Sequence, residues 1–175
     1  MLRFSSSFLD RLEEVGIVLL EHATAYGLVG PIARASGIPK DLRKVLPYSD
    51  YDRAEFTVPT ETDGDGYARL RILFDEAEQS ANIIRQMAMS LPTGPVVCAP
   101  FKTVSGASLG WAEAPRGAAF HWLRCESDGC VTRYRLMTPS FTNWHGFHLA
   151  AEDFAFQDFP IIMATFGLSN AESDR

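Results

Sequence analysis

The strongest pattern of hydrophobic and polar positions follows Asp63-Gly-Asp-Gly66, where apolar residues recur three and four positions apart. This spacing predicts a long amphipathic helix from about Asp65 to Leu91, ended by Pro92 and packed against other helices. The acidic run before it lacks the ligand spacing of an EF-hand calcium loop, so we interpret Asp65 as a helix cap. The apolar face of this helix consists of Leu70, Leu73, Ala77, Ile84, Met87 and Leu91, with Ser80 as the polar member of the series.

Shorter elements are expected on both sides of this helix. Alternating polarity over Ala54–Val58 predicts a brief strand. Cap residues, early prolines and glycine stops predict helices over Ser7–Glu14, Leu20–Tyr26 and Pro31–Ser36, and later over about Asn143–Glu152 and Asp158–Phe166, with Asp158 as a cap.

Three further segments, Leu109–Glu113, Ala118–Cys125 and Val131–Met137, have the composition of strands and are separated by two turn sequences. They predict a small antiparallel β meander. The fold class that follows is α+β and mostly helical: a helix bundle with one long amphipathic helix plus the meander, in a single domain over residues 1–175.

Composition narrows the classes of partner. The 175 residues are 46% hydrophobic and 22% charged, with a formal charge of -6. This acidity argues against nucleic acid as the main partner, and no apolar run approaches the length of a membrane span. Cys98, Cys125 and Cys130 lack CxxC spacing, which favours free thiols in a reducing compartment; a disulfide between Cys125 and Cys130 across their hairpin is the alternative.

Residues with catalytic or metal-binding chemistry are few. His145 and His148 lie three apart on a predicted helix without a third ligand, so we interpret them as a surface pair. We expect His121 to order the edge of the sheet, and His22 has no diagnostic context. The sequence contains no nucleophile-elbow, P-loop or simple Rossmann motif.

A more specific feature is the turn Glu113-Ala-Pro-Arg-Gly117. Proline fixes the backbone before Arg116, and Gly117 permits a tight reversal after it. Such a turn can hold a guanidinium rigidly in a cleft, where it donates to an anionic group. Taken alone, however, an ordinary Arg-Gly hairpin remains the simpler interpretation.

Several short motifs occur together in a characteristic order. The chain resembles the large subunit shared by nickel-iron hydrogenases, closest to the formate-hydrogenlyase type, and the quinone-site (49-kDa type) subunit of respiratory complex I. The residues that carry this resemblance are Gly30-Pro-Ile-Ala-Arg34-Ala-Ser-Gly37, Asp41-Leu-Arg43, Pro47-Tyr48, Gly64-Asp65, Arg69, Gln79-Ser80, Ile83-Ile84, Glu113–Gly117, His121-Trp122, Pro139-Ser-Phe-Thr-Asn143 and Asp174-Arg175.

The departures from this family pattern are equally informative. Hydrogenase members hold nickel and iron with two CxxC pairs, and the terminal pair would fall here on Ser169 and Glu172. The family's first pair, and its quinone-binding histidine and tyrosine, belong to an N-terminal region that these residues do not match. The resemblance therefore implies the C-terminal part of a large subunit, which keeps the scaffold of the site without nickel-iron ligands.

The resemblance also implies a role and neighbours. We expect a subunit or partial subunit of a membrane-associated NADH:quinone oxidoreductase-like or hydrogenase-like complex; the alternative is a non-catalytic interaction or assembly module. The expected partners are an iron-sulfur small subunit and membrane subunits, at the cytoplasmic face of the inner membrane. No cofactor is expected on this chain itself, while quinone and a partner-held iron-sulfur cluster are expected nearby.

Two groups of site residues follow from the resemblance. The expected cleft contains Glu113, Arg116, His121, Glu172 and Asp174, with Arg116 paired to Glu172 in an assembled complex. For the chain alone we expect a disordered tail and Arg116 pointing to water. In the expected polar network Asp41 bridges Arg34 and Arg43, and a solvated charge cluster is the equally weighted alternative.

Overall fold

The computed structural model describes residues 6–95, 97, 105–152 and 154–173. The elements occur in the order α1 (Ser6–Leu9), α2 (Leu20–Ala25), α3 (Gly30–Ala35), α4 (Leu42–Val45), α5 (Gly66–Met89), β1 (Gly106–Ala114), β2 (Gly117–Cys125), β3 (Val131–Met137), α6 (Pro139–Ala150), a 3-10 turn (Phe156–Asp158), α7 (Phe159–Phe166) and α8 (Asn170–Ser173). This composition is α+β, with a small three-stranded sheet, as the sequence predicts.

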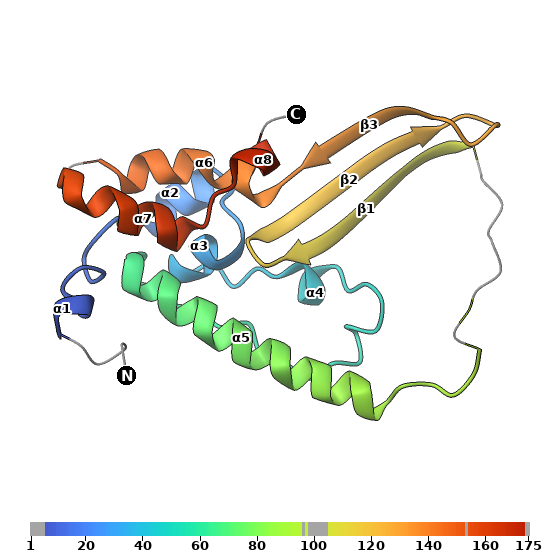
Figure 1. The fold of residues 1–175 in the computed structure, drawn as a ribbon, viewed down its shortest axis with the longest axis horizontal. Coiled ribbons are helices and arrows are strands. Elements are labelled where there is room, and N and C mark those ends of the chain that lie inside the picture. The colour runs from blue at the N-terminus through green and yellow to red at the C-terminus, as the bar shows by residue number, and fades with distance from the viewer. Residues whose placement is uncertain (1–5, 96, 98–104, 153, 174–175) are drawn as a thin grey trace.

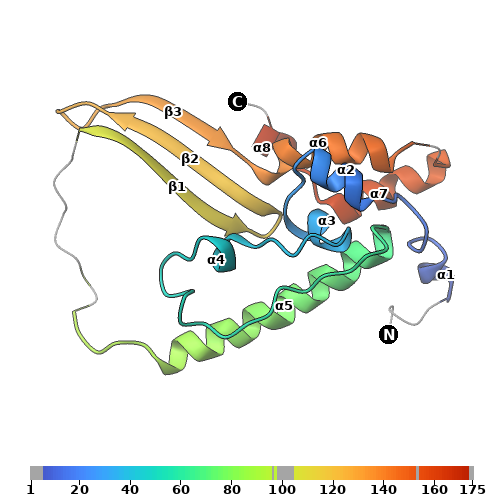
Figure 2. The same ribbon diagram turned by 180° about the vertical axis from the view of Figure 1, so that it is seen from behind.

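Helices α2, α3, α6 and α7 gather at one end of the molecule, and the sheet and α5 extend from that end in diverging directions (Figures 1 and 2). The helical end contains the largest apolar cluster, in which Val18, Leu28, Ile32, Phe147, Ile162 and Phe166 are buried together. A smaller cluster of Ala35, Ala68 and Ile72 attaches the first turns of α5 to α3. The core therefore lies where these helices meet.

The sheet is an antiparallel meander in the order β1-β2-β3. Gly106 pairs with Cys125 and Ala114 with Gly117, so the Pro115-Arg116 turn closes the β1–β2 hairpin at the helical end. A register shift at Arg124/Cys125 interrupts the β2–β3 ladder near the opposite turn. His121 lies on the central strand β2 and contacts Tyr134 on the edge strand β3 (Nδ1 to hydroxyl, 2.6 Å), which is consistent with its expected role in ordering the sheet edge.

Helix α5 begins one residue after Asp65, whose carboxylate accepts from Ala68 N–H (2.7 Å) and from Glu14 N–H (2.9 Å). The predicted cap is thus present, and it also holds the N-terminal segment. Arg69 on the next turn is fully buried, donates to the carbonyls of Gly16 and Gly64, and lies over the Phe166 ring. Burial lowers the pKa of Arg69 to about 9, against the opposing charge of Asp65.

Two predicted elements are wrong. The helix expected over Ser7–Glu14 ends at Leu9, and the chain continues in turns to Glu14, whose N–H donates to Asp65. The strand expected over Ala54–Val58 is an extended segment, because the backbone of Glu55 bonds to the Gln86 side chain on α5. In both places a side chain on or beside α5 binds the backbone of the segment: Asp65 takes one N–H, that of Glu14, and Gln86 takes both the N–H and the C=O of Glu55.

Candidate functional site

The turn that carries Arg116 is pressed against the start of α3. A Cβ atom on Gly30 would lie 2.1 Å from the Arg116 carbonyl oxygen, and both Gly30 and Gly117 have positive φ angles. Asn143 of α6 closes the contact, since its side chain accepts from Val29 N–H (2.9 Å) and donates to Val29 C=O (3.1 Å). Three separate elements therefore fix the backbone beneath Arg116.

The Arg116 side chain reaches the C-terminal helix α8. Its Nη1 lies 2.6 Å from Glu172 Oε1, while Ser140 Oγ donates to Glu172 Oε2 (2.5 Å). Thr138 also donates to the Glu172 carbonyl at 2.8 Å. The expectation of a solvent-facing Arg116 in the chain alone is therefore wrong, because residues at the start of α6 hold Glu172 in place from two sides.

These contacts determine the ionisation of Glu172. Partial burial acts to raise the pKa of Glu172, but the hydrogen bond from Ser140 and the charge of Arg116 outweigh it and lower this pKa. The carboxylate is therefore the favoured form at neutral pH. The charge of the Arg116 guanidinium is therefore neutralised by Glu172, and the Ser140 hydroxyl donates its hydrogen bond to the same carboxylate.

A second cluster surrounds Arg34, which is 1% exposed on α3. Its Nε donates to Glu76 Oε1 on α5 (2.5 Å), and its Nη1 donates to Glu113 Oε1 on β1 (3.0 Å). Asp41 binds Arg43 in a bidentate pair, with its shortest contact at 2.6 Å, and lies 3.9 Å from Arg34. Asp41 is itself buried. It thus lies between both guanidinium groups as predicted, inside a network that joins α3, α4, α5 and β1.

The pKa values of two carboxylates in this cluster, Asp41 and Glu76, shift in opposite directions. Burial acts to raise the pKa of Asp41, but hydrogen bonds and charge from Arg43, with help from Arg34, lower it overall. Burial likewise raises the pKa of Glu76, and there Arg34 opposes it without cancelling it. The charge of Glu76 is therefore less well compensated than that of Asp41.

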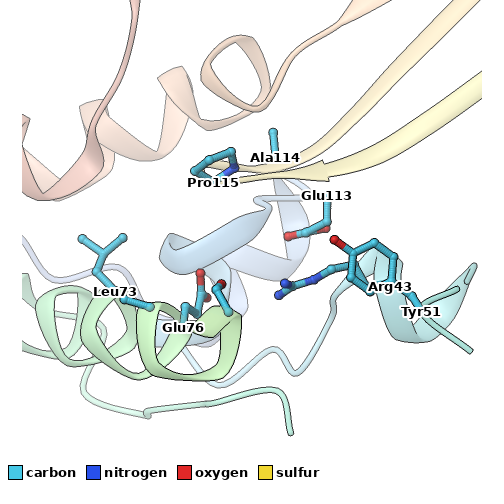
Figure 3. A pocket seen from close by; sticks show the side chains of 9 residues that line it. Arg43, Tyr51, Leu73, Glu76, Glu113, Ala114 and Pro115 are labelled. Atoms are coloured by element: carbon cyan, nitrogen blue, oxygen red, sulfur yellow. The ribbon is translucent and has the colours of Figure 1, made fainter. Parts of the chain in front are cut away.

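A cavity of about 360 Å³ opens beside this cluster, between α5 and the end of β1. Figure 3 shows Leu73 and Glu76 rising from α5, with Ala114 and Pro115 above them and Arg43 and Tyr51 on the α4 side. The cavity thus combines an apolar floor with charged walls.

The residues expected in one cleft are divided by the structure. Arg116 and Glu172 form one cluster, and Glu113 belongs to the Arg34 cluster, where Oε2 also accepts from Leu42 N–H (3.0 Å). His121 lies along β2 and contacts Tyr134. Asp174 lies outside the described residues, as does Cys98.

The histidines and cysteines considered as catalytic or metal-binding residues do not form a common site in the described ranges. His145 and His148 are exposed on α6, and the His145 ring lies 4.2 Å from that of Tyr26. Cys125 and Cys130 are free thiols. Within the described ranges no group of three or more His, Cys, Asp or Glu residues is arranged to hold a metal ion. None of the helices in these ranges combines the length and apolarity required to cross a membrane.

Sequence reasoning missed residues that complete both clusters. Glu76 falls within the predicted long helix, and nothing in the sequence distinguishes it from Glu78 as a site residue. Thr138 is the N-cap of α6, and Ser140 lies in the first turn of this helix. A Thr-Pro-Ser start of a helix is a local signal for capping, but it carries no information about a distant glutamate.

Comparison with known proteins settles the family. A profile of the family described as respiratory-chain NADH dehydrogenase, 49 Kd subunit, matches residues 1–108 and 96–175. The chain belongs to this 49-kDa subunit family. The matched segments together span the chain from end to end.

Individual relatives include both branches of the resemblance. The chain is 36% identical to an NADH-quinone oxidoreductase subunit of Desulfotalea psychrophila over 173 residues, covering 95% of this chain and 46% of that protein. It is 38% identical to the corresponding NADH-quinone oxidoreductase subunit of Clostridium beijerinckii, covering 96% and 46%. It is 31% identical to the carbon monoxide-induced hydrogenase of Rhodospirillum rubrum, covering 90% and 44%. This 49-kDa family member thus spans less than half the length of these relatives.

Proposed function

We propose that this chain is a subunit, or the C-terminal part of a subunit, of a membrane-associated NADH:quinone oxidoreductase-like or hydrogenase-like electron-transfer complex. The end-to-end match to the 49-kDa family is the observation that carries the proposal. The names of the relatives, NADH-quinone oxidoreductase and carbon monoxide-induced hydrogenase, supply the reaction class.

We further propose that the chain contributes a scaffold to the site and not metal ligands. At the place where the resemblance puts a terminal thiolate pair, the side chains are Ser169 and Glu172. Glu172 is already engaged by Arg116 and Ser140, and a hydrogen-bonded carboxylate is a poor substitute for the thiolates that nickel requires. A nickel-iron centre does not fit this donor set.

The proposed surroundings follow from the same family. The partners are an iron-sulfur small subunit and membrane subunits, and the complex lies at the cytoplasmic face of the inner membrane. Quinone and the cluster of the small subunit lie near the Arg116 turn. The fixed backbone beneath Arg116 supports this assignment, because it holds the guanidinium at a defined place, where N–H donors other than the one that binds Glu172 can orient a carbonyl group.

The test replaces Arg116 with alanine in the assembled complex. Recovery of the iron-sulfur subunit and quinone-linked electron flow are measured together, and both are expected to fall several-fold. Arg124→Ala on β2 is the matched control, since Arg124 is largely exposed and its ion-pair partner Glu126 is 3.9 Å away. If Arg116→Ala leaves both subunit recovery and electron flow unchanged, the proposed site near the Arg116 turn is wrong. If the purified chain contains stoichiometric nickel, the proposed scaffold role is wrong. Reduced assembly with normal electron flow per complex would favour an assembly module.

A further inference from the structure

One face of the sheet has apolar residues near the helical end and arginines near the β2–β3 turn, and we call it the arginine face. Residues that pair across antiparallel strands lie on the same face, so the register defines its members. From the helical end outward these are Glu113 with Ala118, Trp111 with Phe120 and Met137, Leu109 with Trp122 and Arg135, and Ala107 with Arg124 and Arg133. Apolar and basic groups thus occupy the two ends of one surface.

The described part of the chain covers only the inner end of the arginine face. This face looks toward α4, because Trp111 Nε1 donates to the Leu46 carbonyl at 3.0 Å. Figure 1 shows that the sheet continues well past α4. On that outer part Leu109 is 51% exposed, and Arg133 and Arg135 are also exposed. The outer part of the face is therefore accessible to a partner.

Two of the three arginines on this face lack a carboxylate partner. Arg124 has Glu126, whose Oε1 lies 3.9 Å from its Nε. No carboxylate of the described residues forms an ion pair with Arg133 or Arg135. Arg133 also lies directly opposite Arg124, and like charges in opposed positions destabilise a sheet. An anionic group from outside the chain would therefore be stabilised beside Arg133 and Arg135.

A cavity of about 190 Å³ lies at the inner end of the same face. Ala118 and Phe120 line it from the sheet, and Leu42 and Val45 line it from α4. Val45 is itself more than half exposed, so apolar surface continues from the cavity to its rim. Because these lining side chains are apolar, the cavity is suited to one apolar side chain of a partner.

The register sets the spacing between this cavity and the two arginines. Arg135 lies opposite Trp122, and Arg133 lies opposite Arg124. These positions are four and six residues beyond Ala118, or about 13 and 20 Å at the usual rise of a strand. An extended segment that follows the face would therefore place acidic residues four and six positions from its apolar residue.

We propose that the arginine face binds an extended acidic segment of a separate subunit. An apolar side chain of that segment fills the cavity, and two of its carboxylates pair with Arg133 and Arg135. The forked guanidinium is suited to this task, because it can donate two parallel hydrogen bonds to one carboxylate. The inference rests on the proposed function, in which the chain works beside other subunits, and it specifies the chemistry of one of them.

Two other occupants fit this face less well. The face looks into the angle between the sheet and the α4–α5 side of the molecule, where a planar bilayer cannot follow it (Figures 1 and 2). A nucleic acid would meet only two unpaired arginines on a chain whose formal charge is -6, which is too little basic charge for phosphate binding.

The first experiment titrates the chain with two fluorescein-labelled peptides of equal composition and measures fluorescence polarisation. Leu-Gly-Ser-Gly-Glu-Gly-Glu has the expected spacing, and Leu-Glu-Gly-Glu-Gly-Ser-Gly does not. We expect the first to bind at least about fivefold more tightly, with an affinity that falls as salt is added. Equal affinities would overturn the inference, and so would no binding of either peptide.

Charge-reversed variants test the residues. Arg133→Glu with Arg135→Glu should weaken binding of the first peptide at least about tenfold, and Val45→Asp should weaken it several-fold. The matched control, Arg53→Glu with Arg85→Glu, makes the same change in net charge at exposed arginines outside the sheet and should bind normally. Circular dichroism checks that each variant folds. Equal affinities of the two double variants would contradict a role for the arginine face.

The second experiment measures modification of Arg133 and Arg135 by phenylglyoxal, using mass spectrometry on the chain alone and in the assembled complex. We expect both residues to be protected in the complex. If they react equally in both while the iron-sulfur subunit is recovered, the inference fails and the proposed function stands. If the first peptide binds but no iron-sulfur subunit is recovered with the unmodified chain, the proposed function fails and the acidic-peptide site stands.

Two further results would identify a different occupant and overturn the inference. One is protection of both arginines when the chain is joined only to the remaining part of the Desulfotalea psychrophila relative, which would identify the rest of the large subunit. The other is binding to vesicles of phosphatidylcholine and phosphatidylglycerol that Arg133→Glu with Arg135→Glu abolishes, which would identify a lipid surface.

Discussion

Glycine at position 30 is required by a contact with another segment as well as by its own backbone. Its φ is +70°, and a Cβ there would lie 2.1 Å from the Arg116 carbonyl oxygen. Gly30→Ala is therefore expected to lower the free energy of unfolding by at least about 3 kcal/mol, measured by urea denaturation. Gly27→Ala is the matched control, since Gly27 has a similar φ of +62° and nothing within 4 Å of its Cβ position. It should cost only about 1–2 kcal/mol. Equal losses would contradict the contact.

The Arg116–Glu172 pair predicts a pH dependence. Because the pKa of Glu172 is lowered in the folded state, the unfolded state takes up a proton first as pH falls. The stabilisation is present above the ordinary glutamate pKa of about 4.3 and is lost as pH falls through the lower folded value. Glu172→Gln should cost about 0.5–1 kcal/mol at pH 7 and almost nothing at the acidic limit of the fold.

The control for this pair is Glu126→Gln on the β2–β3 hairpin, whose ion pair with Arg124 is long and exposed. Chemical denaturation at several pH values is the measurement. A cost for Glu172→Gln that stays constant with pH would show that the carboxylate contributes through shape and not through charge.

Among the elements, α5 depends most on a single cap. Asp65 accepts from Ala68 N–H and Glu14 N–H, so Asp65→Ala removes the acceptor for both the helix and the N-terminal segment. The expected cost is about 1–2 kcal/mol, with faster hydrogen exchange in the first turn of α5. Asp63→Ala, which removes only an exposed ion pair with Arg71, should change stability by less than about 0.5 kcal/mol. Equal effects of the two changes would argue against the cap.

Most helices and all three strands of the sheet could be located from periodicity and turn residues, because those signals are local. Which face of α5 is buried could not. Hydrophobic spacing identified Leu73 and Ile84, whereas the chain buries Ile72 and Ile83, each the preceding residue. The buried face includes Arg69, and its burial depends on carbonyl acceptors from nearby Gly64 and from Gly16, which lies 53 residues away in the sequence.

At the scale of the molecule, Arg34 connects four elements through one side chain. Arg34→Met is expected to lower the free energy of unfolding by about 3–5 kcal/mol, because it leaves the buried Asp41 and the partly buried Glu76 and Glu113 without their shared cation. Thermal and urea denaturation measure the loss. Arg53→Met is the control: Arg53 is 80% exposed in a 3.7 Å pair, so little change is expected. A small effect of Arg34→Met would mean that solvent reaches the cluster.

The sequence predicted the part of this cluster that is close along the chain. Arg34, Asp41 and Arg43 lie within ten residues, so their meeting depends on a single bend. Glu76 and Glu113 come from 42 and 79 residues away, and their arrival depends on how α5 and β1 pack against α3. That packing is a tertiary property, and no local pattern specifies it.

The junction of Gly30, Gly117 and Asn143 holds the turn through the main chain of residue 116, whose carbonyl lies against Gly30 and accepts from the Asn143 side chain. No atom of the Arg116 side chain takes part in these contacts. The side chain at position 116 can therefore be replaced without disturbing the contacts that hold the backbone of the turn. Proteins that share this junction can therefore differ in the functional group at position 116 while they keep the same fold.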